Sequence, residues 1–220
     1  MSNARNLANL LGTGTTVPSA KMPTGSVLQT LSATITDVRT MQTTSWADIT
    51  GLSLNITPSA TANKILITGF VTIGVAIDIT PMVAIYAGSG HVGSGTGGNR
   101  TKGHTGLGYW YIQSSGAQDQ QYGFFQCPIN YLWSANTTSQ QTVKLQAING
   151  DSTNVEFYIN RSRRSDNSDW LGSSTSNLTV FSTCCSCCSC CSCSICFCFS
   201  CCSCCSCCSC CSCCSCCSCC

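Results

Sequence analysis

Cysteine has the greatest capacity for chemistry of any residue type in this chain, and nearly all of it lies at one end. Of the 24 cysteines, all but Cys127 lie at or after Cys184, mostly in a repeated Cys-Cys-Ser pattern. Thiolates bind soft metals such as Zn²⁺ and Cu⁺, so a functional tail would hold metal first through Cys184, Cys185, Cys187 and Cys188. The repeat is uniform, however, and has no histidine and no lysine to offset thiolate charge. We therefore favour a low-complexity tail that is disordered when reduced, and we expect no cofactor.

A Gly-rich segment, residues 88–106, is predicted to be the main irregular loop, and loops on rigid β scaffolds often carry binding specificity. His91 and His104 flank it and could bind a metal together. No acidic residue lies near them in the sequence, so exposed loop histidines are the favoured interpretation. The predicted binding residues are the polar and aromatic residues in and beside this segment: His91, Asn99, Arg100, Lys102, His104, Tyr109 and Tyr111.

The densest aromatic group is Tyr109-Trp110-Tyr111, together with Tyr131 and Trp133. Aromatic side chains on an exposed face would suit stacking on the sugars of a surface polysaccharide. Successive side chains on a strand point to opposite faces, so at least one member of the triplet is expected to enter the core. Core packing is favoured over a glycan platform.

No residue pattern indicates an enzyme. Cys127 lies in the apolar run Phe124-Phe125-Gln126-Cys127, where a buried structural thiol is the expected role. The eight carboxylates are scattered, and two of them would act as a glycosidase pair only if the fold brought them into one groove.

The charge pattern argues against nucleic-acid and membrane partners. Only 8% of the residues are charged and the net charge is +2, without the clustered basic face that nucleic-acid binding usually requires. The one basic cluster, Arg161 to Arg164, has Asp166 and Asp169 beside it and is interpreted as a solvated turn. No run of 18 apolar residues predicts a membrane span, and the first residues lack the apolar stretch of a secretory signal, so synthesis in a cytoplasm is expected.

From Ser26 onward the apolar residues alternate with polar ones, and turn residues recur at short intervals, which is typical of a β-sandwich or barrel. Leu52, Leu54 and Ile56, for example, alternate with Ser53 and Asn55. The predicted fold is an all-β, antiparallel, jelly-roll-like sandwich. The predicted organisation is a leader or docking segment at residues 1–25, the sandwich at 26–182 and the Cys-rich tail at 183–220. The strands are expected near residues 27–38, 46–49, 52–56, 64–77, 82–87, 107–113, 122–133, 141–148, 154–160 and 177–181.

Several short motifs occur in a fixed order along the predicted sandwich. They are Gly25-Ser-Val-Leu-Gln29, Asp48-Ile-Thr-Gly-Leu-Ser53, Ile56-Thr-Pro-Ser59, Asn63-Lys-Ile-Leu-Ile67 and, later, Val143-Lys-Leu-Gln146. This ordered set resembles a domain of tail fibre and other virion-associated proteins of marine bacteriophages. Members of that family would end near Phe181, so the tail is interpreted as repetitive DNA translated after a frameshift or a lost stop codon.

The resemblance implies a non-enzymatic virion protein, a tail-fibre-like module that attaches the particle to the host surface. It further implies a location in the virion, a homotrimer, and contacts with other virion or tail proteins and with a host glycan or protein. Three alternatives stay open: a capsid decoration or other virion subunit without receptor binding, a soft-metal protein acting through the tail, and a polysaccharide depolymerase.

Overall fold

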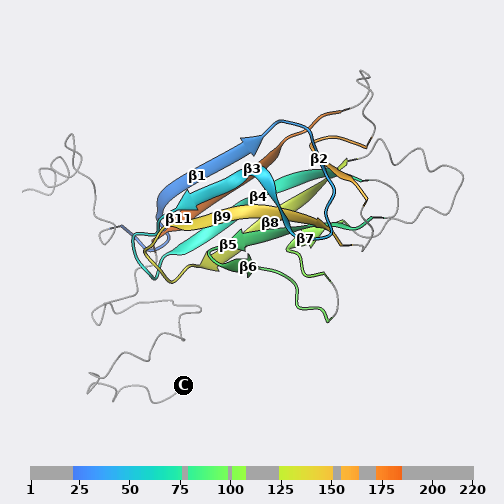
Figure 1. Ribbon diagram of the computed structural model, residues 1–220. Coiled ribbons are helices and arrows are strands. Elements are labelled where there is room, and N and C mark those ends of the chain that lie inside the picture. Colours follow the sequence, from blue (N-terminus) through green and yellow to red (C-terminus); the bar gives the residue numbers. More distant parts are fainter. Residues whose placement is uncertain are drawn as a thin grey trace, which may run out of the picture. The chain divides into compact units, whose positions relative to one another are not determined.

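The computed structural model describes residues 22–75, 79–98, 101–107, 124–150, 155–163 and 172–184. These residues form two antiparallel sheets, and they include no helix (Figure 1). None of these ranges contains a helix long and apolar enough to cross a membrane. The predicted all-β class is confirmed.

Sheet A contains six strands, of which no more than four lie side by side at any point. Its strands are β1 (Val27–Ile35), β2 (Arg39–Met41), β4 (Lys64–Gly74), β8 (Phe124–Ser134), β10 (Phe157–Ile159) and β11 (Ser176–Thr183). β4 pairs with β8 along its whole length, and on its other side it pairs first with β11 and then with β10. β1 and β2 complete the sheet beyond β11 and β10.

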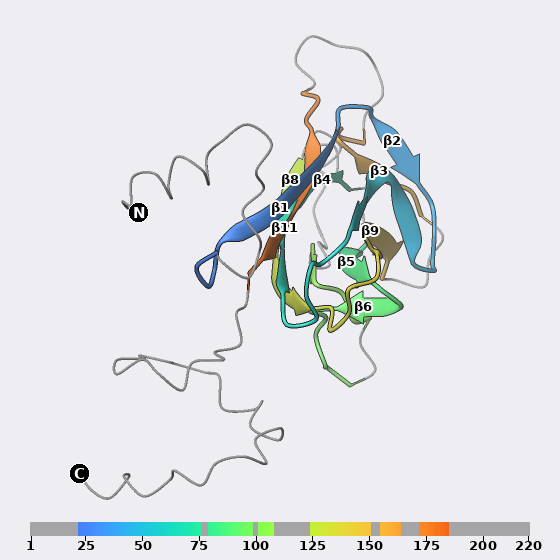
Figure 2. The same cartoon turned by 90° about the vertical axis from the view of Figure 1, so that its left-hand side faces the viewer.

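Sheet B is built in the same way from the remaining strands. Its strands are β3 (Ala47–Ile56), β5 (Pro81–Ala87), β6 (Gly90–Val92), β7 (Thr105–Gly106) and β9 (Gln141–Asn149). The order is β3-β9-β5, and both β6 and β7 pair with the free side of β5. Figure 2 shows the two layers facing each other.

The strand order identifies the architecture. When β1 with β2, β6 with β7 and β10 with β11 each count as one strand, the described part has eight strands in chain order. Sheet A then contains the first, eighth, third and sixth, and sheet B contains the second, seventh, fourth and fifth. This is the arrangement of a jelly roll, in which two Greek keys wrap into a double sheet. The predicted jelly-roll sandwich is thus confirmed.

The core lies between the sheets and is formed by alternate residues of both. Ile65 and Ile67 of β4 face Val143 and Leu145 of β9, and all four are fully buried. The predicted alternation in residues 52–56 is also observed, because Leu52 and Ile56 are buried whereas Ser53 and Asn55 are exposed. Period-two patterning therefore located the core face correctly.

Some predicted boundaries were wrong. Residues 46–49 and 52–56 were predicted as separate strands, but they form one strand, β3, whose pairing with β9 shifts register between Asp48 and Ser53. The predicted strand at 27–38 ends at Ile35 as β1, and the short strand β2 that follows it was not predicted. The Gly-rich loop begins and ends in β6 and β7. Most of the predicted strand at 107–113 lies outside the described residues.

The central strand β4 changes partner in mid-course. Phe70 pairs with Asn177 of β11, and Ile73 pairs with Ile159 of β10, so Thr72 lies at the junction between two partner strands. A backbone without a ladder partner at this buried position would leave unsatisfied polar groups, which are costly.

Asn160 and Ser176 satisfy that junction. The Thr72 amide donates to Ser176 Oγ (2.9 Å), and Thr72 O accepts from the Asn160 amide (3.0 Å). Ser176 Oγ donates to Asn160 Oδ1 (2.6 Å), and Asn160 Nδ2 donates to the carbonyl oxygens of Ile35 (3.0 Å) and Asp37 (3.1 Å). Asn160 has φ +63°, a left-handed conformation that asparagine tolerates better than most residues. This buried network joins β1, β4, β10 and β11.

The first and last strands of the sandwich lie side by side. Their ladder continues past β1 and β11, because the Gly25 amide donates to Cys184 O (2.7 Å) and the Cys184 amide donates to Ser26 O (2.8 Å). Cys184 is buried. The last residue of this ladder is therefore Cys184, two positions beyond the end predicted for the sandwich.

Candidate functional site

The outer face of sheet B carries three aromatic rings in contact. The His91 ring of β6 lies 4.9 Å from the Trp46 ring and 5.7 Å from the Tyr86 ring of β5, both in edge-to-face geometry. Aromatic rings prefer such contacts. Asp48, Lys144 and Gln146 lie on the same face, and the six residues are called the sheet B cluster below.

A chain of hydrogen bonds runs through the cluster, joins β3, β9 and β6, and passes over β5. Gln146 Nε2 donates to Asp48 Oδ1 (2.6 Å), which as a carboxylate oxygen can only accept. Gln146 Oε1 therefore faces His91 Nε2 at 2.6 Å, and His91 must carry a proton on that nitrogen. In neutral His91, Nδ1 is then an acceptor, against which the described part of the chain places no partner.

A small residue on β5 allows this chain to form. Ala84 lies directly opposite Gln146, and Tyr86 lies opposite both Lys144 and His91. Gln146 and His91 must therefore meet diagonally above Ala84, whose methyl group leaves room for them. Ala84 is fully buried on what is otherwise the outer face, which indicates that the side chains above it cover it.

The charged end of the cluster is an ion pair open to solvent. Lys144 Nζ donates to Asp48 Oδ2 (2.8 Å) and lies 4.8 Å from the centre of the Tyr86 ring. The hydrogen bonds from Lys144 and Gln146 hold the pKa of Asp48 below its usual range. The Asp48 side chain is 52% exposed and that of Lys144 24% exposed, so the pair contributes little to stability and both groups remain accessible.

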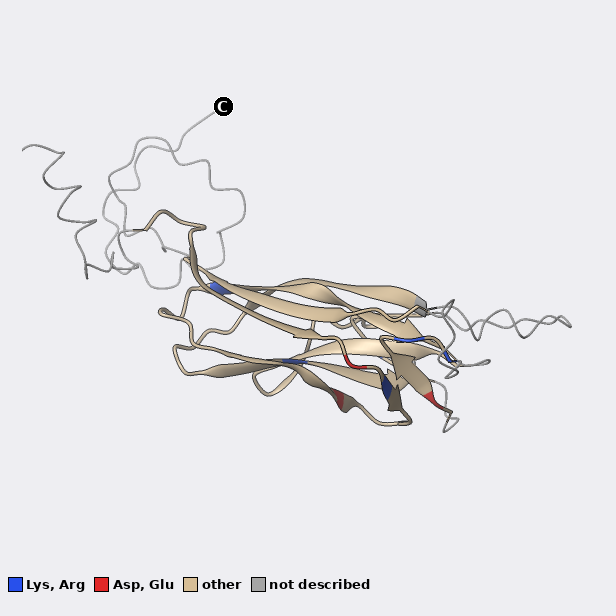
Figure 3. Cartoon of the chain, turned by 90° about the horizontal axis from the view of Figure 1, so that it is seen from above, with Lys and Arg blue, Asp and Glu red and all other residues tan. Residues whose placement is uncertain are grey.

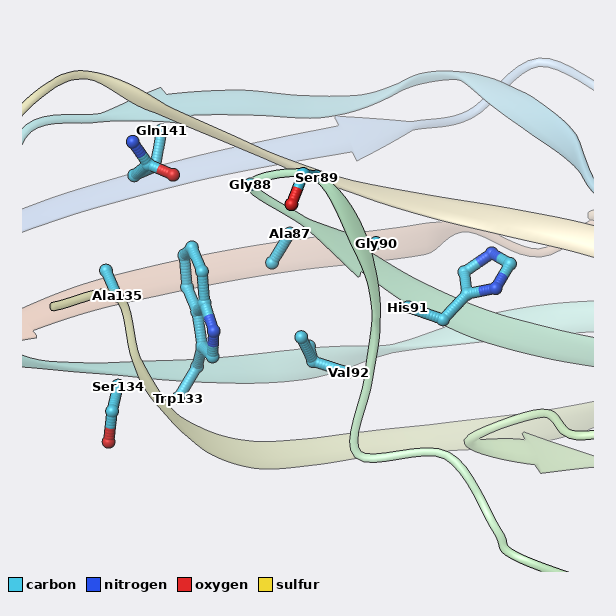
Figure 4. Close-up of a pocket in the computed structure, with 10 residues that line it drawn as sticks. All are labelled: Ala87, Gly88, Ser89, Gly90, His91, Val92, Trp133, Ser134, Ala135 and Gln141. Carbon is cyan, nitrogen blue, oxygen red and sulfur yellow. The ribbon is translucent and has the colours of Figure 1, made fainter. Parts of the chain in front are cut away.

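A pocket of about 430 Å³ lies next to the cluster, at one end of the sandwich. Trp133 of β8, Gln141 and the turn at Gly88 line it, and His91 lies at its margin with its ring directed away from Trp133 (Figure 4). A Cβ added at Gly88 would lie 3.3 Å from the Trp133 ring. Trp133 packs partly against the core, as the core-packing interpretation predicted for it.

His104 has a structural position between the two sheets. Its Nε2 accepts from the Asn130 amide of edge strand β8 (3.3 Å), so its Nδ1 carries the proton and donates to Gly93 O (3.0 Å). Its own amide donates to Val83 O of β5 (2.8 Å). The imidazole thus bridges an edge of sheet A to sheet B. Since His91 is bonded to Gln146 instead, the idea that the two histidines share a metal is not supported.

The remaining predicted site residues are dispersed or lie outside the described ranges. Lys102 is exposed and outside the cluster. Among the described residues there is no group of three or more potential metal-ligating side chains. Those outside the described ranges are Asn99, Arg100, Tyr109, Tyr111, Cys185, Cys187 and Cys188.

Three of the eight carboxylates that a glycosidase pair could use lie among the described residues. Asp37 lies 3.7 Å from Arg39, Asp48 is bonded to Lys144, and Glu156 accepts from the Tyr158 hydroxyl (3.0 Å). Each therefore has a different partner.

Cys127 is expected to resist alkylation in the native protein. It is 1% exposed, and burial raises the pKa of its thiol from 9.0 to about 11. Since the thiolate is the nucleophile, iodoacetamide at pH 8 should leave the Cys127 peptide unmodified until the protein is unfolded in urea. Mass spectrometry of the digested protein measures this directly. Alkylation of Cys127 in the native state would contradict its placement in the core.

The same burial predicts how the free energy of unfolding depends on pH. The Cys127 thiol loses its proton more readily in the unfolded chain than in the folded one, so the free energy of unfolding, relative to that of Cys127→Ala, falls as pH rises from 9.0 to about 11.

Sequence reasoning identified His91 but missed its partners. Trp46 and Tyr86 gave no signal beyond their residue type, and Lys144 and Gln146 were noted only within a strand motif. Their common face depends on the order β3-β9-β5-β6, which joins residues about a hundred positions apart. The alternation of Lys144 and Gln146 with buried Leu145 does predict that the two share one face.

Comparison with protein-family models and with curated proteins finds no match. Among solved structures, a chain in the structure of the infectious bursal disease virus Gx strain is 15% identical, with a TM-score of 0.34, covering 72% of this chain and 42% of that one. A chain in the T13 particle of the same virus is 12% identical, with a TM-score of 0.37, covering 72% and 36%. This chain therefore spans less than half of the length of those chains. The assignment of the jelly roll rests on the strand order and not on these scores.

Proposed function

We propose that the protein is a non-enzymatic structural protein of a virion, and that its jelly roll attaches the particle to a glycan on the host surface through the sheet B cluster. Two observations support the virion role: the ordered motifs that resemble a phage virion domain, and a jelly-roll topology, which recurs in viral capsid and lectin domains. The observation that carries adhesion is the contact of Trp46, Tyr86 and His91 on an exposed sheet face.

The composition of the cluster suits sugar binding. Aromatic rings present an apolar surface to the C–H face of a pyranose, and fixed polar groups beside them can bind its hydroxyls. Trp46 and Tyr86 are half-buried, so each is held by its neighbours while part of its ring stays accessible. Tyr86 lies on β5 and Trp46 directly precedes β3, and this placement limits the entropy lost on binding.

The position of the cluster also favours the cluster over the neighbouring pocket as the glycan-binding site. Ser134 at the pocket is in register with Lys64 and Thr183, so the pocket shares an end of the sandwich with the Gly25–Cys184 ladder. The cluster lies on the outer face of sheet B, whereas that ladder belongs to sheet A. If the protein is attached to the particle through either end of the sandwich, the outer face of sheet B stays open to a ligand.

Weak contacts at one site become effective when several copies act together, because linked sites gain avidity without new contacts. The homotrimer expected from the resemblance would supply such copies, and we include it in the proposal.

Trp46→Ala is expected to abolish glycan binding. The test applies the full chain, kept reduced and fluorescently labelled, to an array of immobilised bacterial surface polysaccharides. Loss of one stacking ring should lower each site's affinity by about tenfold, and avidity should multiply the loss. Asn55→Ala is the matched control. It removes a hydrogen bond from Thr142 (2.8 Å) that joins β3 to β9, and it does not touch the cluster.

Each result discriminates between the possible functions of the protein. Equal binding by Trp46→Ala and the wild-type chain would reject the cluster as the adhesive site. Release of reducing ends from the array would instead indicate a depolymerase. Absence of binding by the wild-type chain would favour a virion subunit without a receptor role. One observation suits that second candidate: Phe181, Leu66 and Leu132 form an apolar row across the outer face of sheet A, with Leu132 55% exposed.

A further inference from the structure

We propose that the sheet B cluster recognises the vicinal diol of a neutral hexopyranose, with Asp48 and Lys144 binding the two hydroxyls and Trp46 supporting the ring. This inference rests on the proposed function and specifies the ligand of the same site. It is carried by the geometry of the ion pair and by the balance of charge in the cluster.

The Asp48–Lys144 pair offers one acceptor and one donor side by side. Each Asp48 oxygen accepts one hydrogen bond from the protein, from Gln146 or Lys144, and retains further lone pairs. The Lys144 ammonium has three protons, of which Asp48 takes one. Two neighbouring hydroxyls, one donating to Asp48 and the other accepting from Lys144, match this arrangement. Hydrogen bonds to charged groups are stronger than those between neutral groups.

Fixed partners hold the pair in position. Gln146 is 9% exposed and connects Asp48 to His91, so the carboxylate is tied to three strands before any ligand arrives. The Tyr86 ring lies against the Lys144 ammonium and limits its motion. A lysine and an aspartate on an open strand would lose more side-chain entropy on binding.

Trp46 provides the apolar surface. It precedes β3 at one edge of sheet B, yet its ring contacts His91 on β6. The indole and imidazole therefore meet above the two strands between them, on the face that also carries the ion pair. Strands in a sheet lie about 4.8 Å apart, so the cluster spans roughly 14 Å, enough for more than one pyranose ring. The acceptor at His91 Nδ1 lies at the far end from Asp48 and suits a hydroxyl of the second ring.

The charge balance favours a neutral sugar over a uronic or sialic acid. Asp48 neutralises Lys144, and no other lysine, arginine or carboxylate belongs to the cluster. Figure 3 shows how few charged residues the described part of the chain carries. An acidic sugar would have to place its carboxylate near Asp48 without an unpaired cation to compensate.

The test measures binding of small glycosides to the reduced full chain by ligand-observed NMR titration. The probes are methyl glucopyranoside, its 2-deoxy and 3-deoxy analogues, and methyl glucuronopyranoside. If one of the two deoxy analogues lacks a hydroxyl that the site binds, the wild-type chain should bind it with about tenfold lower affinity than the complete glucoside. The reason is the loss of one charge-assisted hydrogen bond. The glucuronide should bind more weakly than the glucoside.

Asp48→Asn supplies the readout that a merely structural role would not change. It should abolish the preference for the diol, so that the glucoside and the deoxy analogue bind equally, while Asn55→Ala keeps the wild-type preference. Circular dichroism and thermal unfolding verify that both variants are folded. An unchanged preference in folded Asp48→Asn would overturn the assignment of Asp48.

The outcomes separate this inference from the proposed function. If the wild-type chain binds all glycosides equally, or prefers the glucuronide, and Trp46→Ala abolishes that binding, diol recognition is wrong and adhesion through the cluster stands. If no glycoside binds and Trp46→Ala has no effect on the polysaccharide array, both fail.

Discussion

The Gly69→Ala variant should fail to fold at room temperature or should lose about 4 kcal/mol or more of its free energy of unfolding. A Cβ at this position would lie 2.1 Å from Asn177 O and 3.1 Å from Leu178 Cα, far inside van der Waals contact. Gly69 also has φ +152°, a conformation that residues with a side chain rarely adopt. β4 lies between β8 and β11, so neither neighbour can retreat without breaking a ladder.

Urea unfolding followed by tryptophan fluorescence measures this loss, with reductant present throughout. Gly95→Ala is the matched control, because a Cβ there would have no heavy atom within 4 Å. Its expected change is within about 0.5 kcal/mol, as for most surface substitutions. If Gly69→Ala unfolds within about 1 kcal/mol of the wild-type chain, the close approach of β11 to β4 is wrong.

Asn160→Ala is the second substitution with a large expected effect, a loss of about 3 kcal/mol or more. It would leave the carbonyl oxygens of Ile35 and Asp37 and the Ser176 hydroxyl without the partners they now have. Each buried polar group without a partner costs about 1 to 3 kcal/mol. Alanine must also adopt the left-handed φ of +63°, which costs about 1 kcal/mol more.

Two further variants separate these contributions in the same urea assay. Asn160→Gly relieves the backbone cost and loses the same hydrogen bonds, so it should be about 1 kcal/mol more stable than Asn160→Ala. Asn136→Ala has the same backbone demand, with φ +53°, but at an exposed position. It should therefore show the backbone cost alone. Equal losses for Asn136→Ala and Asn160→Ala would mean that the buried network contributes nothing measurable.

The fold class followed from the sequence because burial on one face imposes a period of two on each strand. Ile65, Ile67, Leu52 and Ile56 show that period and are all in the core. β6 escaped prediction because Gly90-His91-Val92 has little intrinsic preference for a strand, and it pairs only because β5 offers a free edge. Tertiary pairing here overrides local propensity.

The site could be predicted only in part, for a related reason. His91 was selected as a loop residue, and its contacts with Trp46 and Gln146 depend on which strands become neighbours. That order is a property of the whole jelly roll and not of any window of sequence. The role of Ala84 is less predictable still, because an alanine in a strand does not reveal that two side chains meet above it.

The ladder that joins Gly25 and Ser26 to Cys184 has an evolutionary consequence. A domain whose two ends leave side by side can be spliced into a surface loop of an unrelated protein without stretching either chain. Such a domain behaves as a genetic cassette, since recombination can move it between genes while its interior stays unchanged. The sheet B cluster would travel with it, because every residue of that cluster lies between those two ends.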